Sequence, residues 1–236
     1  MAENVSVQID SANTGLGNMA HDRGLLDEAE STSHPMTRLR LYRWTRATVS
    51  IGNHQQPDRA FDFNYCDTNG IPWVRRPSGG RAVFHSSELT YAVVSNDARI
   101  FPPGSLVETY ERLAGWLVEG MSRAGISARI THRQRASPLS PGGRAPGPCF
   151  LSPTRDAVTW AGRRLVGSAQ RRARHSFLQH GSIPLQIDYP HMGAALAVEP
   201  DHLRQRVISA SEAAGAAVGF HHLARALEAA FLEMFC

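Results

Sequence analysis

The sequence predicts an α+β domain with a mixed, largely antiparallel sheet flanked by helices. Three observations predict this class. Segments of strand type follow one another at hairpin spacing, a long amphipathic helix stands in the middle of the chain, and helical segments lie towards both ends. At 236 residues the chain is long enough to bury a sizeable core. We therefore expect a single domain over residues 1–236, with a mobile loop at about 133–148 and a helical C-terminal part from about 190 to 236.

The first part of the chain is expected to form one helix and a series of short strands. Residues 18–30 have the composition of a helix, and Asn18 is the candidate for its N-cap. Polar and apolar residues alternate in residues 38–44, which is typical of a strand with one buried face. Further strands are expected at 48–52, 71–75, 82–85 and 89–94.

Residues 105–124 carry the strongest helical pattern in the sequence. Apolar side chains recur there at spacings of three and four, namely Leu106, Tyr110, Leu113, Leu117 and Met121. Gly125 follows the last of them and predicts the C-terminal end of the helix.

The second half is expected to add a hairpin and three helices. Residues 133–148 are rich in Pro, Gly and Arg and have little to bury, so a mobile loop is predicted there. The remaining strands are expected at 127–131, 157–160, 164–170 and 177–185, with a turn at 161–162. Helices are expected at 190–197, 200–210 and 213–235.

Composition limits the function classes. No apolar run is long enough to span a membrane, and the N-terminus lacks a secretory signal, so we predict a cytoplasmic protein without membrane contact. Three widely spaced cysteines indicate neither a disulfide scaffold nor a zinc site, and no metal or cofactor is expected. The net charge of +4 is weak support for nucleic-acid binding, which is not predicted; it also fits an acidic protein partner or a phosphorylated ligand. A monomer is expected.

All 25 basic residues of the chain are arginine, and there is no lysine. An arginine side chain stays protonated in proteins and presents a planar fork of donors in place of a point charge. Any chemistry that needs a lysine must therefore use another residue here.

The first candidate site is the stretch 75–85, which contains two adjacent glycines between expected strands. Glycine lets the backbone approach a ligand closely, and nearby arginines can hold an anion or a carbonyl oxygen. The alternative is a simple hairpin turn with solvated arginines. The candidate residues are Arg76, Gly79, Gly80, Arg81 and His85.

Two later stretches are also unusually polar or small for strands. Small residues at 167–169 leave space against a sheet, although a bulge in an edge strand is the alternative. Residues 178–183 place polar residues within an apolar frame, which also suits a satisfied polar cluster in the core. The candidates are Gly167, Ser168, Ala169, Gln170, His180, Gly181 and Ser182.

Cys149 is the candidate nucleophile. It follows the predicted loop and has arginines on both sides in the sequence, and nearby positive charge lowers the pKa of a thiol. The alternative is a small buried apolar residue. Cys66 has no such setting and is expected to be structural, and Cys236 ends the chain.

Taken together, these motifs resemble a known family. Residues 75–85 followed by 88–91 resemble the signature of the superfamily of lipoate ligases, biotin ligases and octanoyltransferases. Within it, the segments 149–150, 162–170 and 178–183 resemble the Gram-positive-type octanoyltransferases. The resemblance runs from about residue 10 to about residue 196 and rests on four linked motifs in order.

This resemblance implies a fold, an activity and partners. The fold is akin to the catalytic domain of class II tRNA synthetases. The activity moves an octanoyl group from acyl carrier protein to a lysine of a lipoyl domain, such as that of the glycine cleavage H protein or a 2-oxoacid dehydrogenase E2, without a cofactor. The cysteine at position 149 carries the group as a thioester.

The resemblance also implies roles for the candidate residues. Gly79, Gly80, Arg81 and the strand at 167–169 would wall an acyl tunnel, with Arg76 and His85 near its mouth. Gly181 and Ser182 would close the opposite side, and Gln170 and His180 belong to the same motifs.

The sequence departs from the family at a position that matters. Arg164 stands where the family has a lysine that binds the acyl carbonyl and lowers the pKa of the cysteine, and Ser86 replaces a frequent acidic residue. Arginine keeps the positive charge but not the shape. Two alternatives stay open: an ATP-dependent lipoate–protein ligase, which would also need the missing lysine, and a catalytically inactive homologue that binds acyl groups or lipoyl domains, which Arg164 favours.

Overall fold

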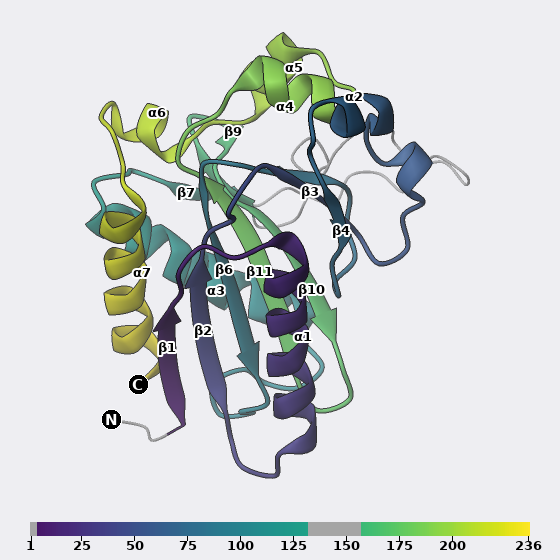
Figure 1. Cartoon of the computed structure of the whole chain (residues 1–236). Coiled ribbons are helices and arrows are strands. Elements are labelled where there is room, and N and C mark those ends of the chain that lie inside the picture. The colour runs from purple at the N-terminus through teal and green to yellow at the C-terminus, as the bar shows by residue number, and fades with distance from the viewer. Residues whose placement is uncertain (1–3, 132–156) are drawn as a thin grey trace, which may run out of the picture.

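The computed structural model describes residues 4–131 and 157–236 (Figure 1). The loop predicted at 133–148 and the candidate Cys149 lie outside the described residues.

A five-stranded sheet forms the centre of the fold. Its strands lie in the order β1 (Val5–Ile9), β2 (Thr37–Tyr42), β6 (Glu88–Ser95), β11 (Phe177–Pro184) and β10 (Gly167–Arg172). The strands β1 and β2 are parallel, and every other neighbouring pair is antiparallel. The predicted mixed, largely antiparallel sheet is confirmed.

Helices cover both faces of this sheet. Helix α1 (Gly15–Ser31) lies on one face, and helices α3 (Leu106–Arg123) and α7 (Phe220–Phe235) cover the other (Figure 1). Alternate residues of β2 and β6 therefore belong to different cores: Leu41 and Tyr91 pack towards α3 and α7, whereas Tyr42 and Ala92 pack towards α1.

Two smaller sheets extend the centre. In one, β3 (Thr48–Ile51) lies between β4 (Trp73–Arg75) and β5 (Val83–His85). In the other, β8 (Ala157–Trp160) lies between β7 (Arg129–Thr131) and β9 (Arg163–Arg164). A separate core beneath β3 and β5 is completed by α4 (Tyr189–Leu196) and α5 (Pro200–Arg206). The short elements are η1 (Pro57–Arg59), α2 (Phe63–Thr68) and α6 (Ala210–Ala214).

The predicted N-cap of the first helix is wrong. Helix α1 begins at Gly15 because Thr14 Oγ1 accepts a hydrogen bond from the amide of Gly17 at 3.1 Å. Asn18 lies one turn into the helix, fully buried, where its side-chain oxygen accepts a hydrogen bond from Arg40. A buried arginine, invisible in the local sequence, determines the role of this asparagine.

The helices predicted near the C-terminus are shorter than expected. Gly215, with a φ of +67°, ends α6, so the helix predicted at 213–235 is interrupted before α7 begins at Phe220. The helix predicted at 200–210 ends at Arg206, because Val207 is extended and forms a bridge with Arg164.

The strand predicted at 164–170 is divided between two sheets. β9 pairs with β8 across the predicted turn, where Ala161 and Gly162 both have positive φ. β10 begins three residues later in the central sheet. Strand β1 and helix α2 were not predicted. None of the helices in the described part of the chain is long and apolar enough to cross a membrane.

Candidate functional site

A pocket lies on the α1 side of the central sheet, between this sheet and the strands β3 and β5. The space between its lining atoms, counted together with the open solvent at its mouth, is about 360 Å³. Its lining comes from α1, β2, β3, β5, β6, β10, β11 and the loop after β4, and consists of Met19, Tyr42, Trp44, Ser50, Arg76, Val83, His85, Thr90, Gly167, Ser168, Ala169, His180, Gly181 and Ser182.

Small residues on β10 and β11 form one wall of the pocket. Gly167 pairs with Ser182 and Ala169 pairs with His180 across the ladder. At Gly181, an added Cβ would lie 2.5 Å from the ring of Tyr91 and 2.6 Å from the carbonyl oxygen of Gly167. Only glycine therefore lets β10, β11 and Tyr91 approach this closely.

Arg76 holds the glycine loop against β3. Its Nη1 donates to the carbonyl oxygen and to Oγ of Ser50, each at 3.1 Å, and its Nη2 donates to the carbonyl oxygens of Gly79 at 2.8 Å and Arg81 at 2.7 Å. Gly80 has a φ of +88°, and a Cβ there would lie 2.8 Å from Arg76 Nη2. The loop therefore requires glycine at this position.

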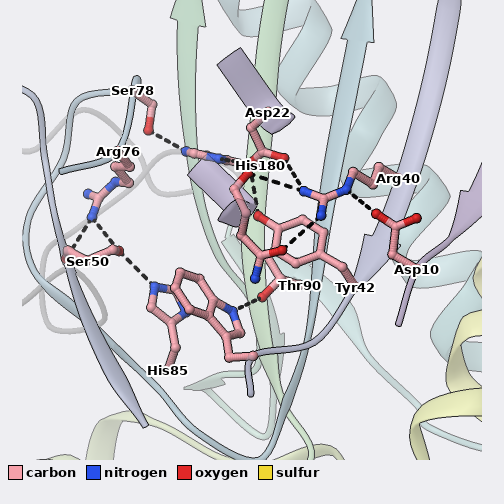
Figure 2. A network of polar contacts seen from close by, with 12 residues as sticks. Asp10, Asp22, Arg40, Tyr42, Ser50, Arg76, Ser78, His85, Thr90 and His180 are labelled. Atoms are coloured by element: carbon pink, nitrogen blue, oxygen red, sulfur yellow. Dashed lines mark hydrogen bonds and ion pairs between the residues drawn. The ribbon is translucent and has the colours of Figure 1, made fainter. Parts of the chain in front are cut away.

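A chain of buried polar groups crosses the pocket at His85. Nε2 of His85 lies 2.7 Å from Ser50 Oγ, and its Nδ1 lies 2.8 Å from Glu88 Oε1. Glu88 also accepts hydrogen bonds from the hydroxyls of Ser182, at 2.6 Å, and Thr90. The indole of Trp44 stacks on His85 with 4.0 Å between ring centroids, and its Nε1 donates to Thr90 (Figure 2). We name Ser50, His85 and Glu88 the His85 chain.

A second chain of the same chemistry lies beside it. His180 Nε2 lies 2.6 Å from Ser78 Oγ, and His180 Nδ1 lies 2.9 Å from Asp22 Oδ2. We name Ser78, His180 and Asp22 the His180 chain. Asp22 also accepts hydrogen bonds from Arg40 Nη1 at 2.8 Å and from the Tyr42 hydroxyl at 2.9 Å (Figure 2).

Arg40 pairs with the His180 chain within the core and also with Asp10. Burial acts to lower the pKa of Arg40, but the attractions of Asp22, Tyr42 and Asp10 together outweigh it, so the pKa is raised above its usual value. Burial first, and the negative charge of Asp22 second, raise the pKa of Tyr42 well above its usual value. Asp22 and Arg40 thus form a hydrogen-bonded ion pair that is almost inaccessible to solvent.

The structure brings many of the candidate residues together. Eight line the pocket: Arg76, His85, Gly167, Ser168, Ala169, His180, Gly181 and Ser182. Gly79, Gly80 and Arg81 lie in the loop that Arg76 holds, and Gln170 donates to Gln179 Oε1 at 3.0 Å. Arg164 is buried in β9, where its carbonyl oxygen accepts from the amide of Ile208. The described residues that line the pocket do not include Gly79, Gly80, Arg81, Gln170 or Arg164.

Sequence reasoning missed four members of the two chains: Asp22, Ser50, Ser78 and Glu88. Glu88 lies three residues after His85, a spacing that could have drawn attention to it. Ser50 and Asp22 gave no local signal, because they reach their histidines from β3 and α1. Among the described residues, no group of three or more His, Cys, Asp or Glu side chains could hold a metal ion.

Comparisons with known proteins identify the family. The model of the lipoyl protein ligase A/B catalytic domain matches residues 15–232. The chain is 38% identical to the octanoyltransferase LipM of Kyrpidia tusciae, over 93% of this chain and 84% of that protein. It is 36% identical to the octanoyltransferase LipM of Carboxydothermus hydrogenoformans, over 82% of this chain and 70% of that protein.

Solved structures show the same fold. The bipartite lipoate protein ligase of Thermoplasma acidophilum superposes with a TM-score of 0.72 at 20% identity, covering 98% of this chain and 83% of that one. A lipoate-protein ligase A bound with ATP superposes with a TM-score of 0.73 at 22% identity, covering 99% and 85%. The chain therefore belongs to the lipoyl protein ligase A/B catalytic domain family and, within it, to the octanoyltransferases of the LipM type.

Proposed function

We propose that this protein transfers an octanoyl group from acyl carrier protein to a lysine of a lipoyl domain, as a step of lipoate biosynthesis. The observation that carries the proposal is the pocket, whose glycine-lined wall on β10 and β11 faces the arginine–glycine loop that follows β4. The curated relatives at 36–38% identity, which are named octanoyltransferases, support the same activity.

The transfer proceeds in two steps through Cys149. The thiolate attacks the thioester carbonyl of octanoyl–acyl carrier protein, a new C–S bond forms, and the carrier leaves as its thiol. The lysine amine then attacks the enzyme thioester, the amide forms, and the Cys149 sulfur leaves. Splitting the transfer in this way replaces one difficult step by two easier ones. Arg164 supplies positive charge for the thiolate and for the developing oxyanion.

The remaining candidate residues bind the acyl donor and shape the pocket. Gly167 and Ala169 keep the wall flat enough for an alkyl chain, Gly181 lets β11 approach Tyr91 behind the wall, and Arg76 fixes the loop with Gly79, Gly80 and Arg81. Ser168 Oγ lies 2.7 Å from the Tyr91 hydroxyl, which ties β10 to the core behind it. Ser182, His180 and Gln170 are held by the bonds described above.

We propose lipoyl domains, such as those of the glycine cleavage H protein or 2-oxoacid dehydrogenase E2, as acceptors. The net charge of +4 suits acidic partners. The T. acidophilum neighbour is described together with an E2 lipoyl domain, which supports a domain of this class. We further propose that the protein acts as a monomer in the cytoplasm.

One residue favours a second candidate, an inactive homologue that binds acyl groups or lipoyl domains. Arg164 stands at the position of the family lysine, and its fork cannot reproduce the geometry of an amine.

A transfer assay tests the proposal. Purified protein is mixed with octanoyl–acyl carrier protein and a lipoyl domain without ATP, and the mass of the lipoyl domain is followed. The proposal predicts one octanoyl group per domain with the wild type and none with Cys149→Ser. Modification only with free octanoate and ATP would indicate a ligase, and an unmodified domain with bound protein would indicate the inactive homologue.

A further inference from the structure

We propose that His85 takes up the proton that the acceptor amine releases when the amide forms, and that the Ser50 hydroxyl conducts this proton from the pocket to the imidazole. The inference rests on the proposed octanoyl transfer and assigns a residue to its second step.

The second step must dispose of one proton. The amine nitrogen attacks the thioester carbonyl carbon, the C–N bond forms, and the C–S bond breaks with its electron pair on sulfur. The amide nitrogen keeps one hydrogen fewer than the amine had. The chain contains no lysine, and arginine stays protonated. Of the described residues that line the pocket, His85 and His180 are the ones suited to take up a proton near neutral pH.

Hydrogen-bond counting fixes the protonation of the His85 chain. The hydroxyls of Thr90 and Ser182 both donate to Glu88, which is the pattern of an acceptor-only carboxylate, and this carboxylate lies 2.8 Å from His85 Nδ1. The proton of His85 therefore sits on Nδ1. Ser50 Oγ accepts from Arg76 Nη1, so its own hydrogen is directed at His85 Nε2. His85 thus holds a lone pair on Nε2, connected to the pocket by a serine hydroxyl (Figure 2).

The two chains differ in the charged partners of their carboxylates. Asp22 of the His180 chain is already paired with Arg40. In the described part of the chain no guanidinium contacts Glu88, so a protonated His85 becomes its counter-charge at 2.8 Å. The Trp44 ring, stacked on the imidazole, adds a favourable face for a cation. Arg76 contacts the same Ser50 hydroxyl as His85, and its positive charge opposes the protonation of His85. Among the described contacts of Ser50 and His85, Arg76 is the one that brings a cation.

The serines of the two chains differ in their place at the pocket. Both histidines line the pocket and both serines are buried, but Ser50 is among the described residues of the lining and Ser78 is not. In the proposed step, the amine nitrogen gives a proton to Ser50 Oγ while the Ser50 hydroxyl proton passes to His85 Nε2. The imidazolium then releases this proton to solvent, from which the carrier thiolate freed in the next acylation takes one up, and this closes the cycle.

Single-turnover kinetics separate the two steps. The wild type and His85→Ala are loaded with octanoyl–acyl carrier protein and freed of excess donor, and a lipoyl domain is then added. We expect loading to change less than about threefold and transfer to the lysine to slow by about 100-fold or more, the usual contribution of a general base. Ser50→Ala should slow the same step, and the variant with both substitutions should be no slower than His85→Ala, because the two residues act as one unit.

Hydroxylamine provides the matched control, because it is a small molecule uncharged near neutral pH, so that solvent can take up the proton it releases. Loaded wild type and loaded His85→Ala should release the octanoyl group to hydroxylamine at similar rates, and their melting temperatures show whether folding is retained. Transfer by His85→Ala at the wild-type rate, or an equal loss in loading, transfer and hydroxylamine release, would overturn the inference. Failure of the wild type to load would instead overturn the proposed function.

Discussion

The His85 chain and the His180 chain share one chemistry but differ in how their charge is balanced. Each joins a serine, a histidine and a carboxylate, with both imidazole nitrogens within 2.9 Å of their partners. Asp22 in the His180 chain is paired with Arg40, which also pairs with Asp10, and is held by the Tyr42 hydroxyl. Glu88 in the His85 chain is held by hydroxyls and by His85 itself. The His180 chain, which has Arg40 as a counter-ion, therefore serves the fold. The His85 chain, in which Glu88 gains a positive partner only when His85 takes up a proton, suits proton transfer.

Asp22→Asn should produce the largest loss of stability. Removing Asp22 from the buried ion pair leaves Arg40 with one carboxylate, that of the less buried Asp10, and breaking such a pair costs up to about 3–5 kcal/mol. Urea unfolding measures this loss. Asp58→Asn is the matched control, because Asp58 is exposed and should change the unfolding free energy by less than about 0.5 kcal/mol. Equal stability of Asp22→Asn and wild type would remove the distinction between the two chains.

Glu88→Gln should reverse this pattern, with a small effect on stability and a large one on transfer. The amide removes one acceptor and the charge that stabilises protonated His85, so the single-turnover transfer rate should fall roughly 10- to 100-fold. The unfolding free energy should fall by about 1–3 kcal/mol, the cost of one unsatisfied buried group. If stability collapses while the transfer of the folded fraction is unchanged, Glu88 has only a structural role.

Tyr91 is a reference for both chains, because it is a buried titratable group whose described hydrogen bonds, to Ser168 and Gln179, involve neither a carboxylate nor a guanidinium. Burial raises the pKa of Tyr91 to about 12, above its ordinary value of 10. Its contribution to stability is therefore present below pH 10 and is lost as the pH rises towards 12. Cys66, whose pKa burial raises to about 11, acts in the same direction.

Urea midpoints between pH 9 and 12 test this expectation. The unfolding free energy should fall by roughly 1–3 kcal/mol across the range, and Tyr91→Phe should show a shallower fall than the wild type. An unchanged slope in this variant would show that burial of Tyr91 does not govern the alkaline limit.

Arg164→Lys should have the smallest effect. Lysine keeps the positive charge near the proposed thioester and adds a group that can exchange a proton, so transfer should stay within about threefold of the wild type or rise. If the introduced amine can accept the proton, His85→Ala should also cost less in this background than in the wild type. A loss of more than tenfold from Arg164→Lys alone would show that the site is built around the guanidinium.

Local patterns in the sequence were sufficient for four of the five strands of the central sheet, all but β1, and for most of the pocket. Alternation predicted the strand at 38–44, and helical spacing predicted α3, where Leu113, Leu117 and Met121 are buried. The same pattern placed Leu106 on the buried stripe, but its side chain is 49% exposed, because the first turn of the helix extends beyond the core. Glycine pairs and small strand residues located the two walls of the pocket.

The two polar chains could not be predicted because their members meet only in three dimensions. Asp22 reaches His180 across 158 positions of sequence, and Ser50 reaches His85 across 35. A buried acid on α1 looks in the sequence like part of a solvated helix face. Its partner Arg40 alternates with leucines in β2 and looks like the exposed side of a strand, although it is almost completely buried.

The intact mass of the protein after incubation with octanoyl–acyl carrier protein tests the central claim most directly. The account predicts one octanoyl adduct on the wild type that hydroxylamine removes, and no adduct on Cys149→Ser. An unmodified wild type that is folded, or an adduct that persists on Cys149→Ser, would contradict it.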